Sequence, residues 1–203
     1  RLKEGGRVRF AGLSCHGPAG RPGDSMEKVL GAAVEDGRFD LLLLVYNFLN
    51  REEGEKVLAA CKSKNVGTTG MKTSPASLKV EPFDPANPTG EYADAMKRMK
   101  ERGLTDEEAI ARIQRWVQRS EEESAKARPC AEQHGASTDE KLRQVALQWA
   151  LANPDLHTAC LSLPDFNSVD RFLPLSGPSM TQAAARFIED YRIARGHLYC
   201  RHG

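Results

Sequence analysis

Along the chain, short apolar runs of strand length alternate with longer segments in which the apolar positions have helical spacing. Strand-like runs occupy residues 9–14, 41–46, 66–71 and 158–162, and a helical segment follows each of them. This alternation predicts a parallel sheet whose strands are connected by helices. Because Leu41–Val45 is apolar at every position, we expect both faces of that strand to be covered.

Capping residues predict the ends of the first two helices. Asp24 or Ser25 can cap a helix that closes at residues 36–37, an aspartate and a glycine. A second helix is expected over residues 52–64. Behind the third strand, residues 72–90 are rich in proline and have no sustained period, so they predict a long loop.

Two capping boxes predict later helices. Residues 105–108 open an amphipathic helix that continues through Trp116, and residues 137–140 open another that ends before Pro154. Trp116 and Trp149 share helical spacing with other apolar residues, so we expect both indole rings in the core.

Two further segments complete the pattern. Residues 121–123 are three glutamates, which predict a solvated helix face. Residues 181–195 predict the last helix, with Gly196 as its C-cap, and no compact element is expected after it.

The composition and net charge of the chain disfavour two classes of binding partner. The 29 lysines and arginines nearly balance the 28 aspartates and glutamates, so we expect neither a nucleic acid nor an anionic membrane as partner. No apolar run approaches the roughly 20 residues that cross a bilayer. The five cysteines lack paired spacing, which favours reduced thiols and a cytoplasmic location. Because residues 1–6 resemble the end of a helix with its glycine stop, we expect a segment before them.

Strand–helix units of this kind occur both in doubly wound sheets and in barrels, and periodicity does not separate the two. A dinucleotide-binding doubly wound sheet needs a Gly-x-Gly-x-x-Gly turn after its first strand. Residues 12–17, Gly-Leu-Ser-Cys-His-Gly, lack that pattern. A complete flavodoxin-like domain is therefore the weaker alternative.

The order of the runs resembles the last four strands of the aldo/keto reductase family. Residues 6–14, GRVRFAGLS, are similar to the family run GK-I-R-x-I-G-V-S at the fifth barrel strand. Residues 36–47 resemble the sixth strand, residues 64–72 the seventh, and residues 147–162 the helix and the eighth strand. The resemblance implies an α/β fold of the (β/α)8 TIM-barrel type, of which only about four carboxy-terminal units, a half barrel, are present.

The resemblance also divides the chain into two parts. Residues 1–175 would form the half barrel, with a long loop and a helical insertion at about 73–136. Residues 176–203 would hold a carboxy-terminal helix and the start of a cysteine-containing tail, similar to the ferredoxin-like tail in a bacterial branch of the family. If the tail continued, Cys200 would be a ligand of a [4Fe–4S] cluster. Such a cluster needs four thiolates, so Cys200 alone cannot hold one.

The implied function follows from the half that is present. Family members catalyse with an aspartate, a tyrosine, a lysine and a histidine on the first four strands, so the resemblance implies no catalytic residue here. It implies part of an NAD(P)H-dependent oxidoreductase for carbonyl substrates that is inactive alone. The strands present would hold NADP or NAD at their carboxyl ends. The implied cofactor contacts are Ser14, Cys15, Tyr46, Met71, Lys72, Thr73, Ser162, Asp165 and Asn167.

Departures from the family pattern leave the choice between NAD and NADP open. Leu43 replaces the usual glutamine, and Cys15 stands where asparagine is common. Pro164 lies about where an arginine commonly contacts the NADP 2′-phosphate. Lys72 offers only a point charge in place of the arginine fork.

Other interpretations of local motifs are weaker, and one alternative function remains. Residues 14–16, Ser-Cys-His, would point to opposite faces of a strand, which disfavours a nucleophile. Residues 197–202 offer only three zinc-type ligands.

The alternative to a reductase is a non-enzymatic half barrel that pairs its open sheet edges with another copy or with a separate amino-terminal half, because unpaired edges bind further strands.

Overall fold

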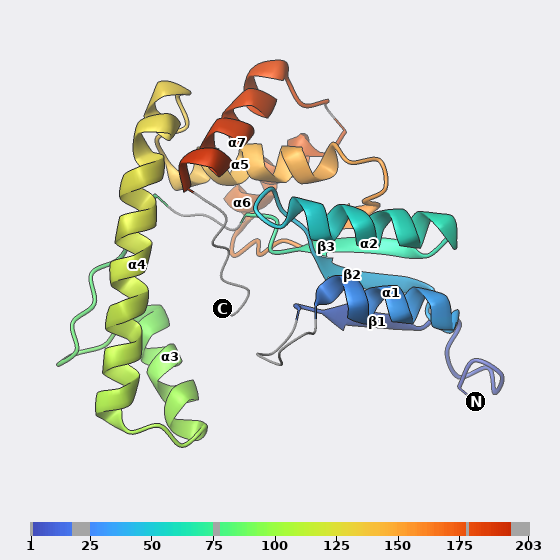
Figure 1. The fold of residues 1–203 in the computed structure, drawn as a ribbon, viewed down its shortest axis with the longest axis horizontal. Helices are drawn as coiled ribbons and strands as arrows, with labels where there is room; N and C mark the ends of the chain where they lie inside the picture. Colours follow the sequence, from blue (N-terminus) through green and yellow to red (C-terminus); the bar gives the residue numbers. More distant parts are fainter. Residues whose placement is uncertain (1, 18–24, 75–77, 178, 196–203) are drawn as a thin grey trace.

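The computed structural model describes residues 2–17, 25–74, 78–177 and 179–195. Within them the fold is α/β, with a four-stranded parallel sheet and seven α-helices (Figure 1). The strands are β1 (Gly12–Cys15), β2 (Leu41–Val45), β3 (Gly67–Met71) and β4 (Thr158–Ala159). The helices are α1 (Met26–Asp36), α2 (Arg51–Ser63), α3 (Gly90–Glu101), α4 (Asp106–Gln133), α5 (Asp139–Leu151), α6 (Phe166–Phe172) and α7 (Gln182–Arg195), with a 3-10 helix η1 (Leu173–Leu175). None of these helices is long and apolar enough to span a bilayer.

The strands are arranged across the sheet in chain order, β1-β2-β3-β4, and all neighbours are parallel. A doubly wound sheet reverses its strand order at a switch point. Because the described strands contain no such reversal, the flavodoxin-like alternative does not fit. The outer strands are shorter than predicted: β1 begins at Gly12 rather than residue 9, and β4 ends at Ala159 rather than residue 162. Each of these edge strands has a partner on one side only, so fewer of its residues are held in a ladder.

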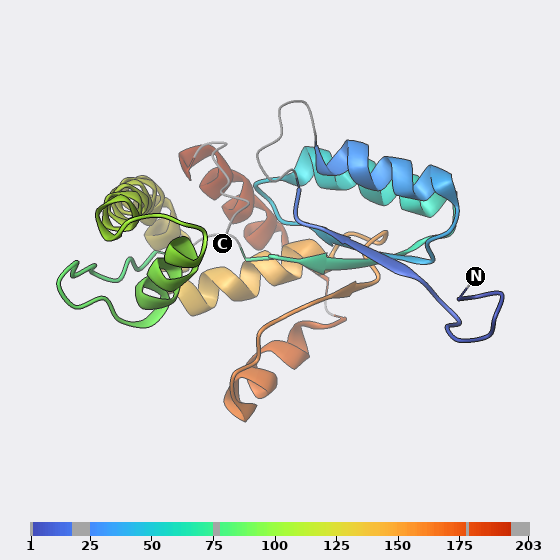
Figure 2. The ribbon, with the colours of Figure 1, turned by 90° about the horizontal axis from the view of Figure 1, so that it is seen from below.

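The two faces of the sheet differ in what covers them. Helices α1 and α2 lie together on one face (Figure 2). Successive side chains of a strand point to opposite faces. In β2, Leu42 and Leu44 are fully buried, whereas Leu41 is 42 % exposed and Leu43 is half-buried. The prediction that both faces of this strand are covered is therefore wrong at Leu41.

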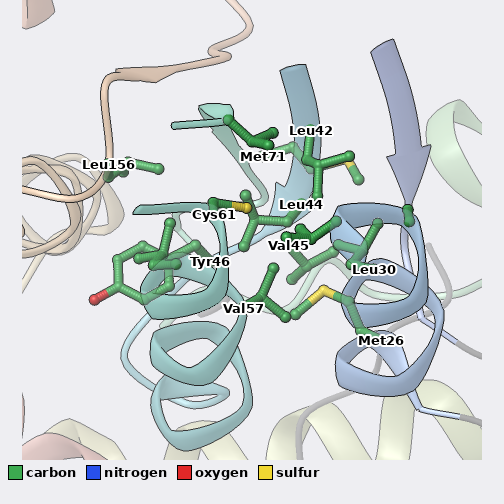
Figure 3. Packing of buried hydrophobic residues seen from close by; sticks show 14 of the residues in the cluster. Met26, Leu30, Leu42, Leu44, Val45, Tyr46, Val57, Cys61, Met71 and Leu156 are labelled. Atoms are coloured by element: carbon green, nitrogen blue, oxygen red, sulfur yellow. The ribbon is translucent and has the colours of Figure 1, made fainter. Parts of the chain in front are cut away.

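The main hydrophobic core lies between the sheet and these two helices. Leu44 meets Met26 of α1 and Val57 of α2, and all three side chains are almost completely buried (Figure 3). Full burial of a side chain of this size stabilises the fold by about 1.5–3 kcal/mol. Helix α1 begins where the Ser25 side chain accepts a hydrogen bond from the Lys28 amide, as predicted for one of the two candidate caps. It ends at Gly37, whose φ of 73° is left-handed.

A second cluster connects α4, α5 and α7 to the turn after β2. Phe48 and Tyr191 are buried there with their rings edge to face at 5.9 Å. Trp149, predicted as a core residue, is half-buried: it packs against both clusters and stacks on Tyr46 at 5.1 Å. Arg195 of α7 is bound to Glu123 of α4 at 2.6 Å.

Helices α3 and α4 form a pair that extends away from the sheet (Figure 1). Three predictions for residues of α4 differ from the structure. Helix α4 continues to Gln133, well beyond Trp116. The Trp116 ring is 40 % exposed, because this two-helix arm buries only a small cluster around Tyr92, so its prediction as a core residue is wrong. Glu123 is only 13 % exposed because it binds Arg195, so the prediction of a solvated acidic face fails at this position.

The two predicted capping boxes differ in outcome. At α4 the box is complete, since the Thr105 hydroxyl accepts from the Glu108 amide and the Glu108 carboxylate accepts from the Thr105 amide. At α5 the N-cap is Thr138 rather than Ser137, and its hydroxyl accepts from the Lys141 amide. The third helical residue is then a lysine, which cannot accept the reciprocal hydrogen bond.

Candidate functional site

The carboxyl ends of β2 and β3 are joined by a buried pair of asparagines. Asn47 and Asn50 are 0 % and 7 % exposed. The Asn47 side-chain oxygen accepts from the Leu49 and Asn50 amides at 2.9 and 3.1 Å. The Asn50 side-chain amide donates to the Val45 carbonyl at 2.8 Å. The turn after β2 is therefore closed by side chains rather than by a backbone ladder.

The same asparagine pair supports the chain after β3. The Asn47 side-chain amide donates to the Lys72 carbonyl at 3.0 Å. Lys72 has a φ of 52°, a left-handed conformation that costs free energy in a residue with a Cβ. Two adjacent predicted cofactor residues, Met71 and Lys72, thus lie at the end of β3, with Met71 7 % exposed.

A small cavity, lined by polar and apolar side chains in equal number, lies between the loops that follow β3 and β4. Its volume is about 20 Å³, which is room for one group the size of a water molecule. It is lined by Thr73, Ser74, Arg143, Leu147, Leu161, Ser162, Leu163 and Phe172. Two predicted cofactor residues, Thr73 and Ser162, therefore lie at one cavity although 89 positions separate them in the sequence.

Two groups at this cavity have unused hydrogen-bonding capacity. The Ser74 hydroxyl is buried and has no hydrogen-bond partner. Arg143 is exposed, its guanidinium lies over the Phe172 ring at 5.2 Å, and no ion pair joins it to another residue of the described part of the chain. Buried hydroxyls normally find a partner, so an unpaired one in a cavity that an arginine also lines could bind a polar or anionic group there. The hydroxyl donates one hydrogen bond and the guanidinium supplies both charge and donors.

Asp165 and Asn167, the two predicted cofactor contacts that follow Ser162, do not line the cavity. Asp165 is the N-cap of α6, and one of its carboxylate oxygens accepts from the Ser168 amide at 2.6 Å and from the Ser168 hydroxyl at 2.7 Å. These hydrogen bonds, the side-chain one first, lower the pKa of Asp165. Asn167 is exposed on the first turn of α6. The Asp165 carboxylate is thus already committed to a helix cap.

The β1 residues lie apart from the cavity. Ser14 is exposed on the face that α1 and α2 leave uncovered, and it pairs with Leu43 of β2. Cys15 is half-buried, and its sulfur accepts from the Gly17 amide at 3.4 Å. Two strands, β2 and β3, separate these residues from the loop after β4.

Tyr46, a predicted cofactor contact, is buried in the hydrophobic core. Its side chain is 1 % exposed, and its hydroxyl accepts from the Asn153 side chain at 2.8 Å. Burial raises the pKa of this phenol. A Cβ on Gly54 would lie 2.5 Å from the Tyr46 ring, so α2 approaches the ring as closely as a glycine permits. These contacts place the ring under α2 and α5, on the helix-covered side of the sheet.

Sequence reasoning missed three polar residues of this region. Arg143 belongs to α5, and nothing in its local pattern separates it from an ordinary solvated helix residue. Ser74 directly follows the predicted Thr73, so the adjacent position was a usable signal. Asn47 was noticed only as part of a family-like run, although two asparagines three positions apart after a buried strand favour a closed polar turn.

The predicted metal ligand Cys200, and with it Gly196, His197 and His202, lies outside the described residues. Among residues 2–17, 25–74, 78–177 and 179–195, no group of three or more histidine, cysteine or acidic side chains could hold a metal ion. Cys15, Cys61, Cys130 and Cys160 are free thiols. These four thiols do not form a cluster, so the described part offers no site for a [4Fe–4S] group.

The structure is thus that of an α/β protein with a four-stranded parallel sheet and a small cavity beside the carboxyl ends of β3 and β4. No protein-family model matches the chain, and no curated protein matches it.

Proposed function

We propose that this chain is the nucleotide-binding half of a (β/α)8-barrel oxidoreductase similar to the aldo/keto reductases. Strand order supports the proposal, because each new parallel strand of a barrel is added on the same side of the previous one, as from β1 to β4. The position of the cavity also supports it, since barrel enzymes bind ligands at the carboxyl ends of their strands.

The cavity between the β3 and β4 loops is the observation that carries the proposal. It combines the Arg143 guanidinium, the unpartnered Ser74 hydroxyl and Ser162. A phosphate oxygen matches these donors in charge and in hydrogen-bond number. The volume of about 20 Å³ fits such an oxygen or a small part of a phosphate, with the remainder of the nucleotide outside. Lys72 directly precedes the lining residue Thr73, so the loop after β3 contributes a further cationic residue.

The division of roles follows from this placement. NAD(P)H, when bound, supplies a hydride for a carbonyl substrate. Arg143, Ser74 and Ser162 bind the phosphate end, whereas Ser14 at the far side of the sheet is positioned for a different part of the cofactor. None of the described residues is proposed as catalytic, and the acid that protonates the carbonyl oxygen comes from outside this chain.

Fluorescence titration with NADPH and NADH tests the proposal. Arg143→Met removes the guanidinium, and we expect it to weaken binding about 10-fold or more, as for loss of a charge-assisted hydrogen bond. Arg186→Met on α7 is the matched control, because Arg186 is an exposed helix arginine outside the cavity. Saturable binding that both variants weaken equally, or no saturable binding of either nucleotide, would overturn the proposal.

A second measurement tests the absence of catalytic residues. The purified chain, mixed with NADPH and a simple aldehyde, is expected to oxidise the nucleotide no faster than a blank. A rate well above the blank that Arg143→Met abolishes would contradict this part of the proposal while leaving nucleotide binding intact.

A further inference from the structure

The chain that leaves the candidate site after Ser74 is bound by the start of α5. Leu78 is 5 % exposed and belongs to the cluster between α4, α5 and α7. Its amide donates to Asp139 Oδ1, and the same oxygen accepts from the Lys79 amide at 3.3 Å. Asp139 is the first residue of α5, directly after the N-cap Thr138. Leu78 is therefore held against α5 through its backbone.

Helix α4 binds the carbonyl group of the same leucine. The Ser124 hydroxyl donates to the Leu78 carbonyl at 2.6 Å, and an Arg128 guanidinium nitrogen donates to it at 3.0 Å. Ser124 is 2 % exposed, so its hydrogen bond is shielded from water. Because the amide and the carbonyl of Leu78 both have partners and its side chain is buried, this residue is a fixed point of the chain.

Ser74 lies between two such fixed points. Two positions before it, the Lys72 carbonyl accepts from the Asn47 side chain at 3.0 Å. Four positions after it, Leu78 is bound by Asp139. A segment this short loses much of its conformational freedom when both of its ends are held. The position of the unpartnered Ser74 hydroxyl in the cavity therefore depends on both ends.

Another part of the cavity wall belongs to the same helix as Asp139. Arg143 and Leu147 line the cavity, and they follow Asp139 on α5 by four and eight positions. Residues at this spacing lie on one face of a helix. One face of α5 thus supplies the Arg143 guanidinium and, about one turn earlier, the carboxylate that binds the chain after Ser74. Asp139 connects the two parts of the wall on which Arg143 and Ser74 lie.

We propose that Asp139 is a positioning residue of the cavity: by holding Leu78 against α5, it keeps Ser74 and Arg143 at the separation that binds a phosphate group. The inference rests on the proposed nucleotide site and adds to it a residue that is not among those lining the cavity. The negative charge of Asp139 would by itself disfavour a phosphate, because like charges repel. An effect through charge and an effect through position therefore have opposite signs.

Titration with NADPH and NADH separates position from charge. Asp139→Ala removes the acceptor of the Leu78 amide, and we expect it to weaken binding about 5-fold or more, the order expected when a buried hydrogen bond is lost. Asp139→Asn removes the charge but keeps a side-chain oxygen that can accept from both amides, so it should bind as tightly as the wild type or more tightly. Asp106→Ala is the matched control and should leave the affinity unchanged. Asp106 is likewise the first residue of a helix after a threonine N-cap, and it is exposed.

A second variant and a structural measurement separate positioning from loss of the fold. Ser124→Ala removes the hydrogen bond from α4 to the Leu78 carbonyl with little change of volume, and it should weaken nucleotide binding about 2-fold or more. It decides the test if Asp139→Ala does not fold. Hydrogen exchange of the Leu78 amide should be faster in Asp139→Ala than in the wild type, whereas that of Ile113, buried in the α3–α4 pair, should be unchanged.

The outcomes distinguish this inference from the proposed function on which it rests. A wild-type chain that binds neither nucleotide would overturn both. Wild-type binding that Asp139→Ala leaves unchanged would overturn the inference alone. The inference also fails if Asp139→Asn or Asp106→Ala weakens binding as much as Asp139→Ala, because charge or overall stability would then act in place of position. Weaker binding in Asp139→Ala and Ser124→Ala, with binding retained in Asp139→Asn and faster exchange at Leu78, supports it.

Discussion

The side-chain amide of Asn47 donates a hydrogen bond to the carbonyl oxygen of Lys72 over 3.0 Å, and Lys72 has a left-handed φ of 52°. A residue at the end of one strand thus stabilises a strained residue at the end of the next. The strain is tolerated because the Asn47 side chain is fully buried and makes hydrogen bonds from both its oxygen and its nitrogen.

Replacing Asn47 is therefore expected to be costly. Asn47→Ala leaves the buried Asn50 amide and the Lys72 carbonyl without partners, and we expect the free energy of unfolding to fall by about 2–4 kcal/mol. Lys72→Gly removes the cost of the left-handed conformation and should lower stability by less than about 1 kcal/mol or raise it. Urea denaturation measures both changes. Asn87→Ala, in an exposed turn, is the control and should change stability by less than about 0.5 kcal/mol; an equal loss in Asn47→Ala and Asn87→Ala would contradict the role of Asn47.

The contact between Gly54 and Tyr46 predicts opposite effects of the same substitution in two helices. Gly54→Ala places a Cβ 2.5 Å from the Tyr46 ring, so we expect a loss of about 1–3 kcal/mol from overpacking. Gly31→Ala in α1 meets no atom within 4 Å and should raise stability by about 0.5–1 kcal/mol through helix propensity. Thermal unfolding of both variants measures the difference, and a stabilised Gly54→Ala would show that the ring has room to move.

The Glu123–Arg195 ion pair predicts a large cost when one partner is removed. Its atoms lie 2.6 Å apart, the side chains are 13 % and 11 % exposed, and two further nitrogens of Arg195 are buried without a partner. Glu123→Leu leaves that guanidinium uncompensated, so we expect a loss of about 3–5 kcal/mol. The double variant with Arg195→Met should recover much of the loss.

An exposed ion pair provides the control for this comparison of single and double variants. Arg51 and Glu55 lie 3.0 Å apart but are 51 % and 42 % exposed, and their coupling should be only about 0.3–0.5 kcal/mol. Denaturant midpoints of the single and double variants give both couplings. A coupling of Glu123 with Arg195 no larger than that of the surface pair would refute the argument from burial.

The Asp165 cap predicts a change of stability at acid pH. The pKa of Asp165 is lowered in the folded protein by hydrogen bonds from Ser168, so its stabilising effect is fully present above the unfolded value of about 3.9 and is lost as pH falls through the folded value. Asp165→Asn cannot titrate, and its unfolding free energy should depend less on pH below about 4 than that of the wild type.

Urea midpoints between pH 7 and pH 3 measure this dependence. Asp94→Asn on α3 is the control, because Asp94 is exposed. We expect the control to follow the wild-type curve. A steeper acid dependence in Asp165→Asn than in the wild type would reverse the sign and contradict the argument.

Local signals predicted the elements well where neighbouring residues decide the structure. The Gly37 stop and the Thr105–Glu108 box were predicted correctly, and Ser25 was one of the two predicted caps, because each depends on hydrogen bonds between residues at most four positions apart. The four strands were found for a similar reason, since apolar runs between polar segments are a local property. Their lengths were overestimated at both sheet edges, where a missing neighbour shortens the ladder.

The candidate site was predicted only in part. Thr73 and Ser162 do line one cavity, but Arg143 enters it from a helix whose own pattern carries no sign of the site. Tyr46 and Asp165 are engaged in packing and capping, which depend on Gly54, Asn153 and Ser168 in the folded chain.

By itself the sequence determined the alternation of strands and helices and most of their caps, because these depend on propensities and hydrogen bonds within a few residues. The tertiary structure decided the strand order that periodicity had left open, and it alone decided that Trp116 is exposed while Glu123 is largely shielded from solvent, and that Ser74, Arg143 and Ser162 line one cavity. Burial and long-range polar contacts depend on which distant segment packs against a residue, and that information is spread over the whole chain rather than contained in any one stretch of it.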